Sequence, residues 1–180
     1  MPVEPTLEVE AELFRAGATV IIGLDEVGRG ALAGPVMVGA CVVTAEYSSF
    51  PSGLRDSKLI SEKKRELIYP MILEWATTSV GEASAEEIDE FGITYALGLA
   101  AKRALTKLHE KEVSIAQATI LLDGSQDWLN PVLAQPLTVV TRVKADQDCA
   151  VVSAASVVAK VTRDRLMSQL HRDHPHFNWE

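Results

Sequence analysis

Four acidic side chains lie at the ends of apolar runs and have the chemistry of a divalent-metal site. Asp25 and Glu26 are adjacent and follow the β-branched, apolar run 19–24. Asp123 ends a second apolar run, and Asp146 lies between a third run and the C-terminal helical segment. Mg²⁺ prefers carboxylate oxygens and leaves coordination positions for water and substrate phosphates. The pattern therefore predicts a magnesium site where strands of an α/β sheet end.

Each of these acids also has a purely structural interpretation. Asp123 precedes a glycine and could form a turn. Asp146 could favour the dipole of the following helix, and Asp148 competes with it as a ligand. Adjacent residues on a regular strand point to opposite faces. Asp25 and Glu26 therefore share one site only if the strand ends or bulges there, or if Glu26 uses its backbone carbonyl.

A glycine-rich turn, Gly28, Arg29 and Gly30, follows the acidic pair. Glycines let backbone groups approach a ligand closely, and Arg29 could face a phosphate or form a structural ion pair. With Ala33 the turn also matches a dinucleotide-binding fingerprint. That fingerprint requires a helix to start at the glycines, whereas the run 36–43 is typical of a strand. We therefore disfavour a dinucleotide-binding turn.

Hydrophobic periodicity predicts alternating strands and helices. We expect strands at 19–24, 36–43, about 77–82, 118–123 and 137–143, and helices at 61–75, from Ser84 to about His109, and at 151–171. Pro70 should bend or interrupt the first helix. Ser84 and Glu87 form a capping box, and Gly92 could break the helix that they start. The pattern predicts an α/β fold with a mixed sheet.

Length and composition favour one soluble globular domain spanning residues 1–180. Hydrophobic residues make up 47% and charged residues 23% of the chain. No apolar run approaches the ~20 residues of a membrane helix, and the acidic N-terminus lacks the features of a secretory signal. We expect a cytoplasmic protein with no membrane partner, in which Cys41 and Cys149 are buried free thiols.

The net charge of −8 does not exclude a nucleic-acid partner, because it does not show where the charges lie. The stretch 55–65 is rich in lysine and arginine, and it is either a phosphate-facing patch or a solvated loop and helix start.

Other polar residues have simpler roles. The histidines near the C-terminus should be solvated, and Asp164 should form ion pairs, with support of the acidic ligands as the alternative. Ser153 and Ser156 lie among alanines, which indicates close helix packing and no serine nucleophile.

Five ordered motifs carry a family resemblance: "GLDEVGRGALAGPV", "DSKLISEKKRE", "ASAEEIDEFGI", "LLDG" and "VVSAASVVAKVTRDRLM". From about residue 20 to residue 175 the chain resembles ribonuclease HII. The resemblance implies a ribonuclease H-like fold, a central mixed β-sheet flanked by helices, with Mg²⁺ or Mn²⁺ as cofactor. It also implies cleavage of the RNA strand of RNA/DNA hybrids, cutting 5′ of single ribonucleotides embedded in duplex DNA, and work in DNA replication and ribonucleotide excision repair.

The resemblance extends to individual site residues. The metal ligands that it implies are Asp25, Glu26, Asp123 and Asp146. The turn Gly28, Arg29 and Gly30 would contact the ribonucleotide and its flanking phosphates, and Lys58 would lie near the nucleic-acid backbone. Hydrolysis would use two metal ions, which activate water and stabilise the leaving oxygen and leave a 5′-phosphate.

Two functions from other classes stay open: a truncated hybrid-binding domain with impaired catalysis, and a Mg²⁺-dependent phosphohydrolase of small molecules. Members of the resembling family continue beyond the position of Glu180 into a "GYGT"-like segment whose tyrosine helps to recognise the junction. We expect this chain to lack that tail and to be a monomer.

Overall fold

The computed structural model of the protein describes residues 4–47 and 49–179. Its strands are β1 (Val20–Val27), β2 (Val36–Thr44), β3 (Thr77–Ala83), β4 (Ala118–Asp123) and β5 (Thr138–Arg142). Its α-helices are α1 (Glu8–Arg15), α2 (Glu62–Trp75), α3 (Ala85–Phe91), α4 (Ile93–Glu110), α5 (Ala145–Asp148) and α6 (Ala150–Asp173). The predicted strands and long helices are confirmed. Helices α1 and α5 were not predicted from the sequence.

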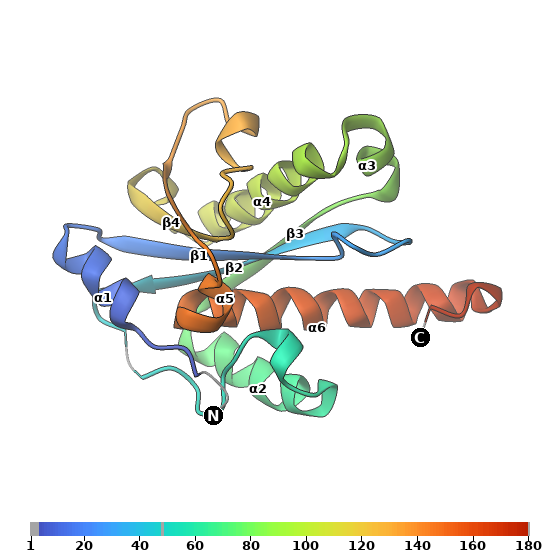
Figure 1. Cartoon of the computed structure of the whole chain (residues 1–180), viewed down its shortest axis with the longest axis horizontal. Helices are drawn as coiled ribbons and strands as arrows, with labels where there is room; N and C mark the ends of the chain where they lie inside the picture. The colour runs from blue at the N-terminus through green and yellow to red at the C-terminus, as the bar shows by residue number, and fades with distance from the viewer. Residues whose placement is uncertain (1–3, 48, 180) are drawn as a thin grey trace.

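The strands form one mixed sheet in the order β3-β2-β1-β4-β5, as Figure 1 shows in part. β1 pairs with β2, and β2 with β3, in antiparallel fashion. β1 and β4, and β4 and β5, are parallel. Leu24 lies opposite Leu122 in the parallel pair, so the carboxyl ends of β1 and β4 reach the same edge of the sheet.

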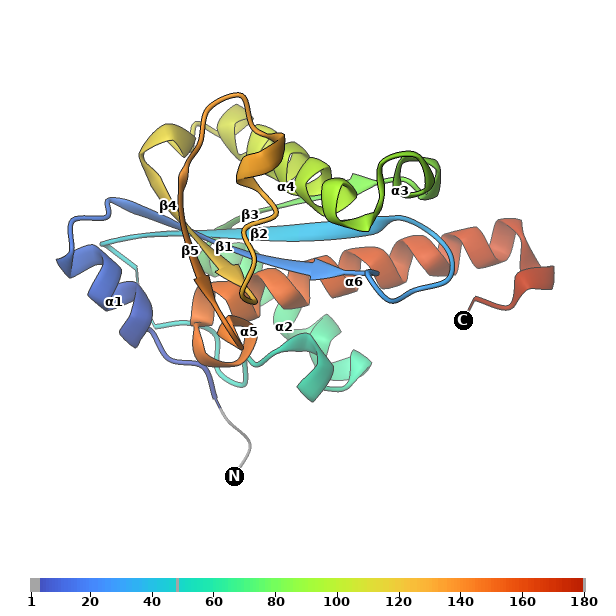
Figure 2. The same ribbon diagram turned by 45° about the horizontal axis from the view of Figure 1, so that its top comes forward.

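Helices cover both faces of this sheet (Figures 1 and 2). One core packs α4 against residues such as Ile22 and Leu24, and the second packs α6, α2 and α1 against residues such as Ile21 and Leu121. Successive β1 side chains therefore alternate between the α4 face and the α6 face, as strand geometry requires. Glycines allow close approach: a Cβ at Gly81 would lie 2.0 Å from a backbone oxygen of α4.

Two sequence predictions about α2 and α3 have different outcomes. Pro70 does not interrupt α2, which runs as one helix from Glu62 to Trp75. Proline removes one helical hydrogen bond, but Ile68 and Ile72 are buried on either side of it and hold the helix through packing. The capping box of Ser84 and Glu87 is confirmed, and Gly92, with a φ of 79°, separates α3 from α4.

Both cysteines are free and buried, as the sequence indicated. In the described part of the chain, none of the helices has the length and apolar composition needed to cross a membrane. The glycine-rich turn leads into strand β2. Residues 28–44, all of which the structure describes, therefore contain no helix of the kind that a dinucleotide-binding turn requires.

Candidate metal and nucleic-acid site

Three aspartates from separate segments converge at one edge of the sheet. Asp25 lies near the end of β1, Asp123 ends the neighbouring β4, and Asp146 lies on α5. One ligand atom from each lies within 4.8 Å of the others. The alternation of side chains explains the convergence, because Asp25 and Asp123 each follow a leucine of the α4 core and therefore point to the α6 face.

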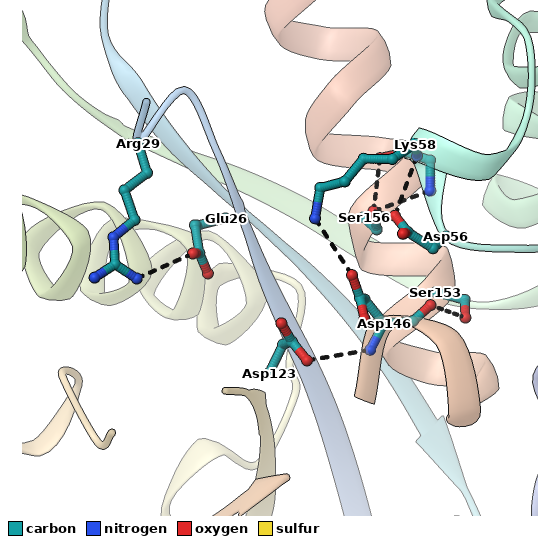
Figure 3. A network of polar contacts seen from close by, with 9 residues as sticks. Glu26, Arg29, Asp56, Lys58, Asp123, Asp146, Ser153 and Ser156 are labelled. Carbon is teal, nitrogen blue, oxygen red and sulfur yellow. Dashed lines mark hydrogen bonds and ion pairs between the residues drawn. The ribbon is translucent and has the colours of Figure 1, made fainter. Parts of the chain in front are cut away.

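The backbone of Asp146 is held on two sides. Its N–H donates to Asp123 Oδ1 at 3.4 Å, and its carbonyl accepts a hydrogen bond from Ser153 Oγ of α6 at 2.6 Å (Figure 3). Asp148, the competing ligand, forms an ion pair with Arg142 at 2.9 Å instead. The geometry thus brings Asp146, and not Asp148, to the other two aspartates.

The Glu26 carboxylate is not part of this group of three. β1 remains a regular strand through Val27, with Asp25 opposite Gly39 and Glu26 opposite Val38. The Glu26 side chain therefore points away from the α6 face, and it pairs with Arg29 at 3.4 Å. Of the two roles open for Arg29, the structural ion pair is the one seen in this structure.

The aspartates are electrostatically unfavourable without a cation. Asp25 is 3% exposed, and its pKa is raised well above the usual range by burial and then by the charge of Glu26. Burial, followed by the charges of Asp56 and Asp123, raises the pKa of Asp146 to about 6. A divalent cation would neutralise these carboxylates, so the donors fit a hard metal ion in type, number and charge.

Lys58 is the cation that reaches this cluster from the "DSK" motif. Its Nζ lies 3.3 Å from Asp146 Oδ2 (Figure 3). Burial lowers the lysine pKa, but the carboxylates of Asp25, Asp56 and Asp146 outweigh it, and the pKa is raised. The ammonium group is therefore charged and bonded to a candidate ligand.

The two arginines of the cation-rich stretch 55–65 make contacts within the protein. Arg55 pairs with Glu4 at 2.7 Å, and Arg65 donates to the carbonyls of Ser57 and Ile60 at 3.0 and 2.8 Å. These contacts hold the loop and the start of α2. The two arginines thus have internal partners in this structure, and a phosphate-facing role of the stretch stays a prediction.

The glycine-rich turn is anchored from below by α6. Arg163 donates from Nε to the carbonyl of Pro35 at 3.0 Å and from Nη2 to that of Ala33 at 2.8 Å. Gly28 has a φ of 91°, and a Cβ there would lie 2.5 Å from Arg163 Nε. A Cβ at Gly30 would meet nothing within 4 Å, so this peptide is open to an approaching ligand.

Sequence reasoning missed the positioning contacts made by α6. Ser153 and Ser156 were interpreted as packing residues only, although both are hydrogen-bonded to site segments. Asp164 does form ion pairs, with Lys160 and with Arg65. The available signal was the spacing: polar residues recur three or four positions apart at 153, 156, 160 and 163, and the first three lie among small and apolar residues in the first half of the helix.

The chain is similar to known proteins of one family. The family model described as Ribonuclease HII matches residues 22–180. A Streptomyces avermitilis protein named Ribonuclease HII is 43% identical over 182 residues, which cover 99% of this chain and 73% of the relative. One from Magnetococcus marinus is 42% identical over 178 residues, 97% of this chain and 79% of the relative.

A solved structure shows the same fold. The structure of the PCNA:RNase HII complex from Archaeoglobus fulgidus matches with a TM-score of 0.66 at 26% identity, over 85% of this chain and 76% of that one. Sequence motifs, fold and family model agree, and the chain belongs to the ribonuclease HII family.

Proposed function

We propose that the chain is a metal-dependent endonuclease that cuts the RNA strand of RNA/DNA hybrids and also cuts 5′ of single ribonucleotides in duplex DNA. The observation that carries this proposal is the convergence of Asp25, Asp123 and Asp146 from three segments. Membership in the ribonuclease HII family supports the substrate, and the hard oxygen donors support the metal.

The three aspartates would hold Mg²⁺ or Mn²⁺, which supplies Lewis-acid stabilisation of charge on the phosphate and its leaving oxygen. Glu26 would join them through its backbone carbonyl, or through its carboxylate after release from Arg29. The side chains of Asp123 and Ser153 bond to the backbone of Asp146, so the backbone of this ligand is already held in place before a cation binds.

The glycine-rich turn would recognise the ribonucleotide. The 2′-hydroxyl distinguishes RNA from DNA, and backbone groups at an open glycine such as Gly30 can reach it. The Arg29 side chain is 51% exposed and pairs with Glu26 at 3.4 Å, so its exposed part is available to a flanking phosphate. Lys58 would face the nucleic-acid backbone from the other side of the aspartates.

The proposal is tested with labelled duplexes. We would compare an RNA/DNA hybrid, a DNA duplex with one ribonucleotide and an all-DNA duplex, with Mg²⁺ and with Mn²⁺. Cleavage of the first two substrates, with the cut 5′ of the single ribonucleotide, is expected. Cleavage of the all-DNA duplex at an equal rate would contradict ribonucleotide recognition.

The same assay, repeated with free nucleotides and at several salt concentrations, distinguishes the two competing functions. A small-molecule phosphohydrolase would hydrolyse free nucleotides with little salt dependence, whereas affinity for a duplex falls steeply as salt rises. A binding domain without catalysis would retain the hybrid and leave it intact with either metal.

A further inference from the structure

We infer that Ser156 of α6 is a positioning residue that sets Lys58 against the aspartates by fixing the turn on which Lys58 lies. This inference rests on the proposed function, because it assigns a purpose to Lys58 in cleavage. It concerns a side chain that lies on a different element from the aspartates and that the sequence indicated only as a packing residue.

The turn is the 3₁₀ segment Ser57–Leu59, which Asp56 caps by accepting a hydrogen bond from the Lys58 N–H at 3.1 Å. Ser156 Oγ lies 3.2 Å from Asp56 Oδ1 and 2.8 Å from Ser57 Oγ, and it accepts from the Ser57 N–H at 3.2 Å (Figure 3). One hydroxyl thus contacts both residues that precede Lys58.

These polar groups are sealed from water. Asp56 is 1% exposed, Ser57 4% and Ser156 1%. A hydroxyl can donate one hydrogen bond and accept two, so Ser156 can donate to the Asp56 carboxylate and accept from the side chain and backbone of Ser57. Buried polar networks of this kind hold one geometry, because any displacement leaves a buried group without its partner.

The geometry of Lys58 depends on this network. The Lys58 side chain is 69% exposed, so packing alone does not fix its direction. Its backbone, in contrast, is tied through Asp56 and Ser57 to α6, and the same helix holds the Asp146 carbonyl through Ser153. Helix α6 thereby fixes the distance between the Lys58 backbone and the backbone of its carboxylate partner, Asp146.

Kinetics of hybrid cleavage with Ser156→Ala, Lys58→Ala and the double variant test the inference. We expect Ser156→Ala to lower kcat by roughly tenfold, with a smaller change in KM, since small displacements of catalytic groups cost 10- to 100-fold. If the serine acts through the lysine, the double variant should be no slower than Lys58→Ala alone, whereas a direct effect of Ser156 on Asp25, with which its hydroxyl also interacts, would add to the loss. Losses that multiply in the double variant, or full activity of Ser156→Ala, would overturn it.

Two controls separate positioning from folding. Ser79→Ala removes another buried hydroxyl, which donates to the Ala104 carbonyl at 2.8 Å on the α4 face, and it should leave kcat unchanged in the folded protein. Ser156→Cys fills the site with a slightly larger thiol and weakens the hydrogen bonds without emptying the position, so its kcat should lie between those of Ser156→Ala and the parent, and it serves as the test variant if Ser156→Ala folds poorly.

A spectroscopic measurement keeps the test independent of cleavage. In protein with ¹³Cε-labelled lysine, the Lys58 signal, assigned with Lys58→Ala, should move toward the value of a free lysine in Ser156→Ala. An unchanged Lys58 signal would refute positioning by Ser156, whether or not the parent cleaves a hybrid. Absence of cleavage by the parent would instead count against the proposed function.

Discussion

The two faces of the sheet are covered by long helices of different chemistry. The side chains that α4 buries are entirely apolar: Ala96, Leu97, Ala100, Ala101, Ala104, Leu105 and Leu108. Helix α6 buries small apolar residues and, among them, Ser153, Ser156 and Arg163. Each of these polar groups bonds to a segment that carries a candidate site residue.

This difference shows where the chain accepts buried polar groups. Burial of such a group costs free energy unless hydrogen bonds replace those to water. On the α6 face they are bonded to Asp146, to the turn of Lys58 and to the glycine-rich loop. We infer that the α4 face serves stability, whereas the α6 face serves stability and the geometry of the site.

Among the buried polar residues of α6, replacement of Arg163 should reduce activity most. Arg163→Met would free the carbonyls of Ala33 and Pro35, so the glycine-rich loop would lose its anchor. We expect kcat/KM for a hybrid to fall by about 100-fold. The matched control is Arg103→Met on α4, which breaks an ion pair with Glu87 and should leave kcat/KM unchanged. Equal losses in both variants would contradict a special role for α6.

Two glycine substitutions test the two helices separately, one against α4 and one against α6. A Cβ at Gly81 would lie 2.0 Å from the Ala100 oxygen of α4, and one at Gly39 would lie 2.3 Å from the Ala155 oxygen of α6. Both Gly81→Ala and Gly39→Ala should lower the free energy of unfolding by about 1–3 kcal/mol, as measured by urea denaturation. Only Gly39→Ala should also reduce the activity of the folded fraction, because it displaces α6.

Glu10 links α1 to the start of α6. It is fully buried, and its Oε1 accepts a hydrogen bond from the Val151 N–H at 2.9 Å, in the first turn of α6. Glu10→Ala should lower the free energy of unfolding by about 1 kcal/mol, the usual cost of losing a cap. Glu10→Gln keeps an acceptor and should cost less. An equal loss in both variants would show that the bond to Val151 is not the relevant contact.

An effect of similar size and opposite sign, a gain in stability, is expected when the candidate metal ligand Asp25 is replaced. The pKa of Asp25 is raised in the folded state, so at neutral pH the cost of burying its charge, or of taking up a proton on folding, destabilises the metal-free protein. Asp25→Asn should therefore raise the Tm without metal by about 2–4 °C, equivalent to roughly 1 kcal/mol for a chain of this size.

The pH dependence of this gain checks its origin. A raised carboxyl pKa destabilises the folded state above that pKa, and the penalty disappears as pH falls toward the unfolded value. The difference in Tm between the parent and Asp25→Asn should therefore shrink with falling pH. A constant difference from neutral to acidic pH would contradict an ionisation effect. Added Mg²⁺ should favour the parent.

Much of the fold could be predicted from local patterns. The strand leading to Asp25 and the capping box at Ser84 follow from hydrophobic periodicity and side-chain chemistry. Helix α1 was missed, because its stabilising residue, Glu10, contacts a segment more than a hundred positions away. An interruption at Pro70 was wrong, because tertiary packing outweighed a local helix-breaking preference, whereas a bend there stays a prediction.

The site was only partly predictable for a similar reason. The ends of apolar runs indicated Asp25, Asp123 and Asp146, but only the structure shows that β1 stays regular through Val27, which sends Glu26 to the opposite face. The roles of Ser156 and Arg163 depend on the packing of α6 beneath distant loops. Such contacts leave only a weak spacing signal in the sequence.

The most direct test is cleavage of an RNA/DNA hybrid with Mg²⁺ by the parent, by Asp123→Asn and by Glu110→Gln, an exposed acid at the end of α4. Loss of one ligand from the aspartate cluster should reduce cleavage by roughly 1,000-fold or more, whereas Glu110→Gln should cleave like the parent. Cleavage by Asp123→Asn at nearly the rate of the parent would contradict the assignment of this edge of the sheet as the catalytic metal site.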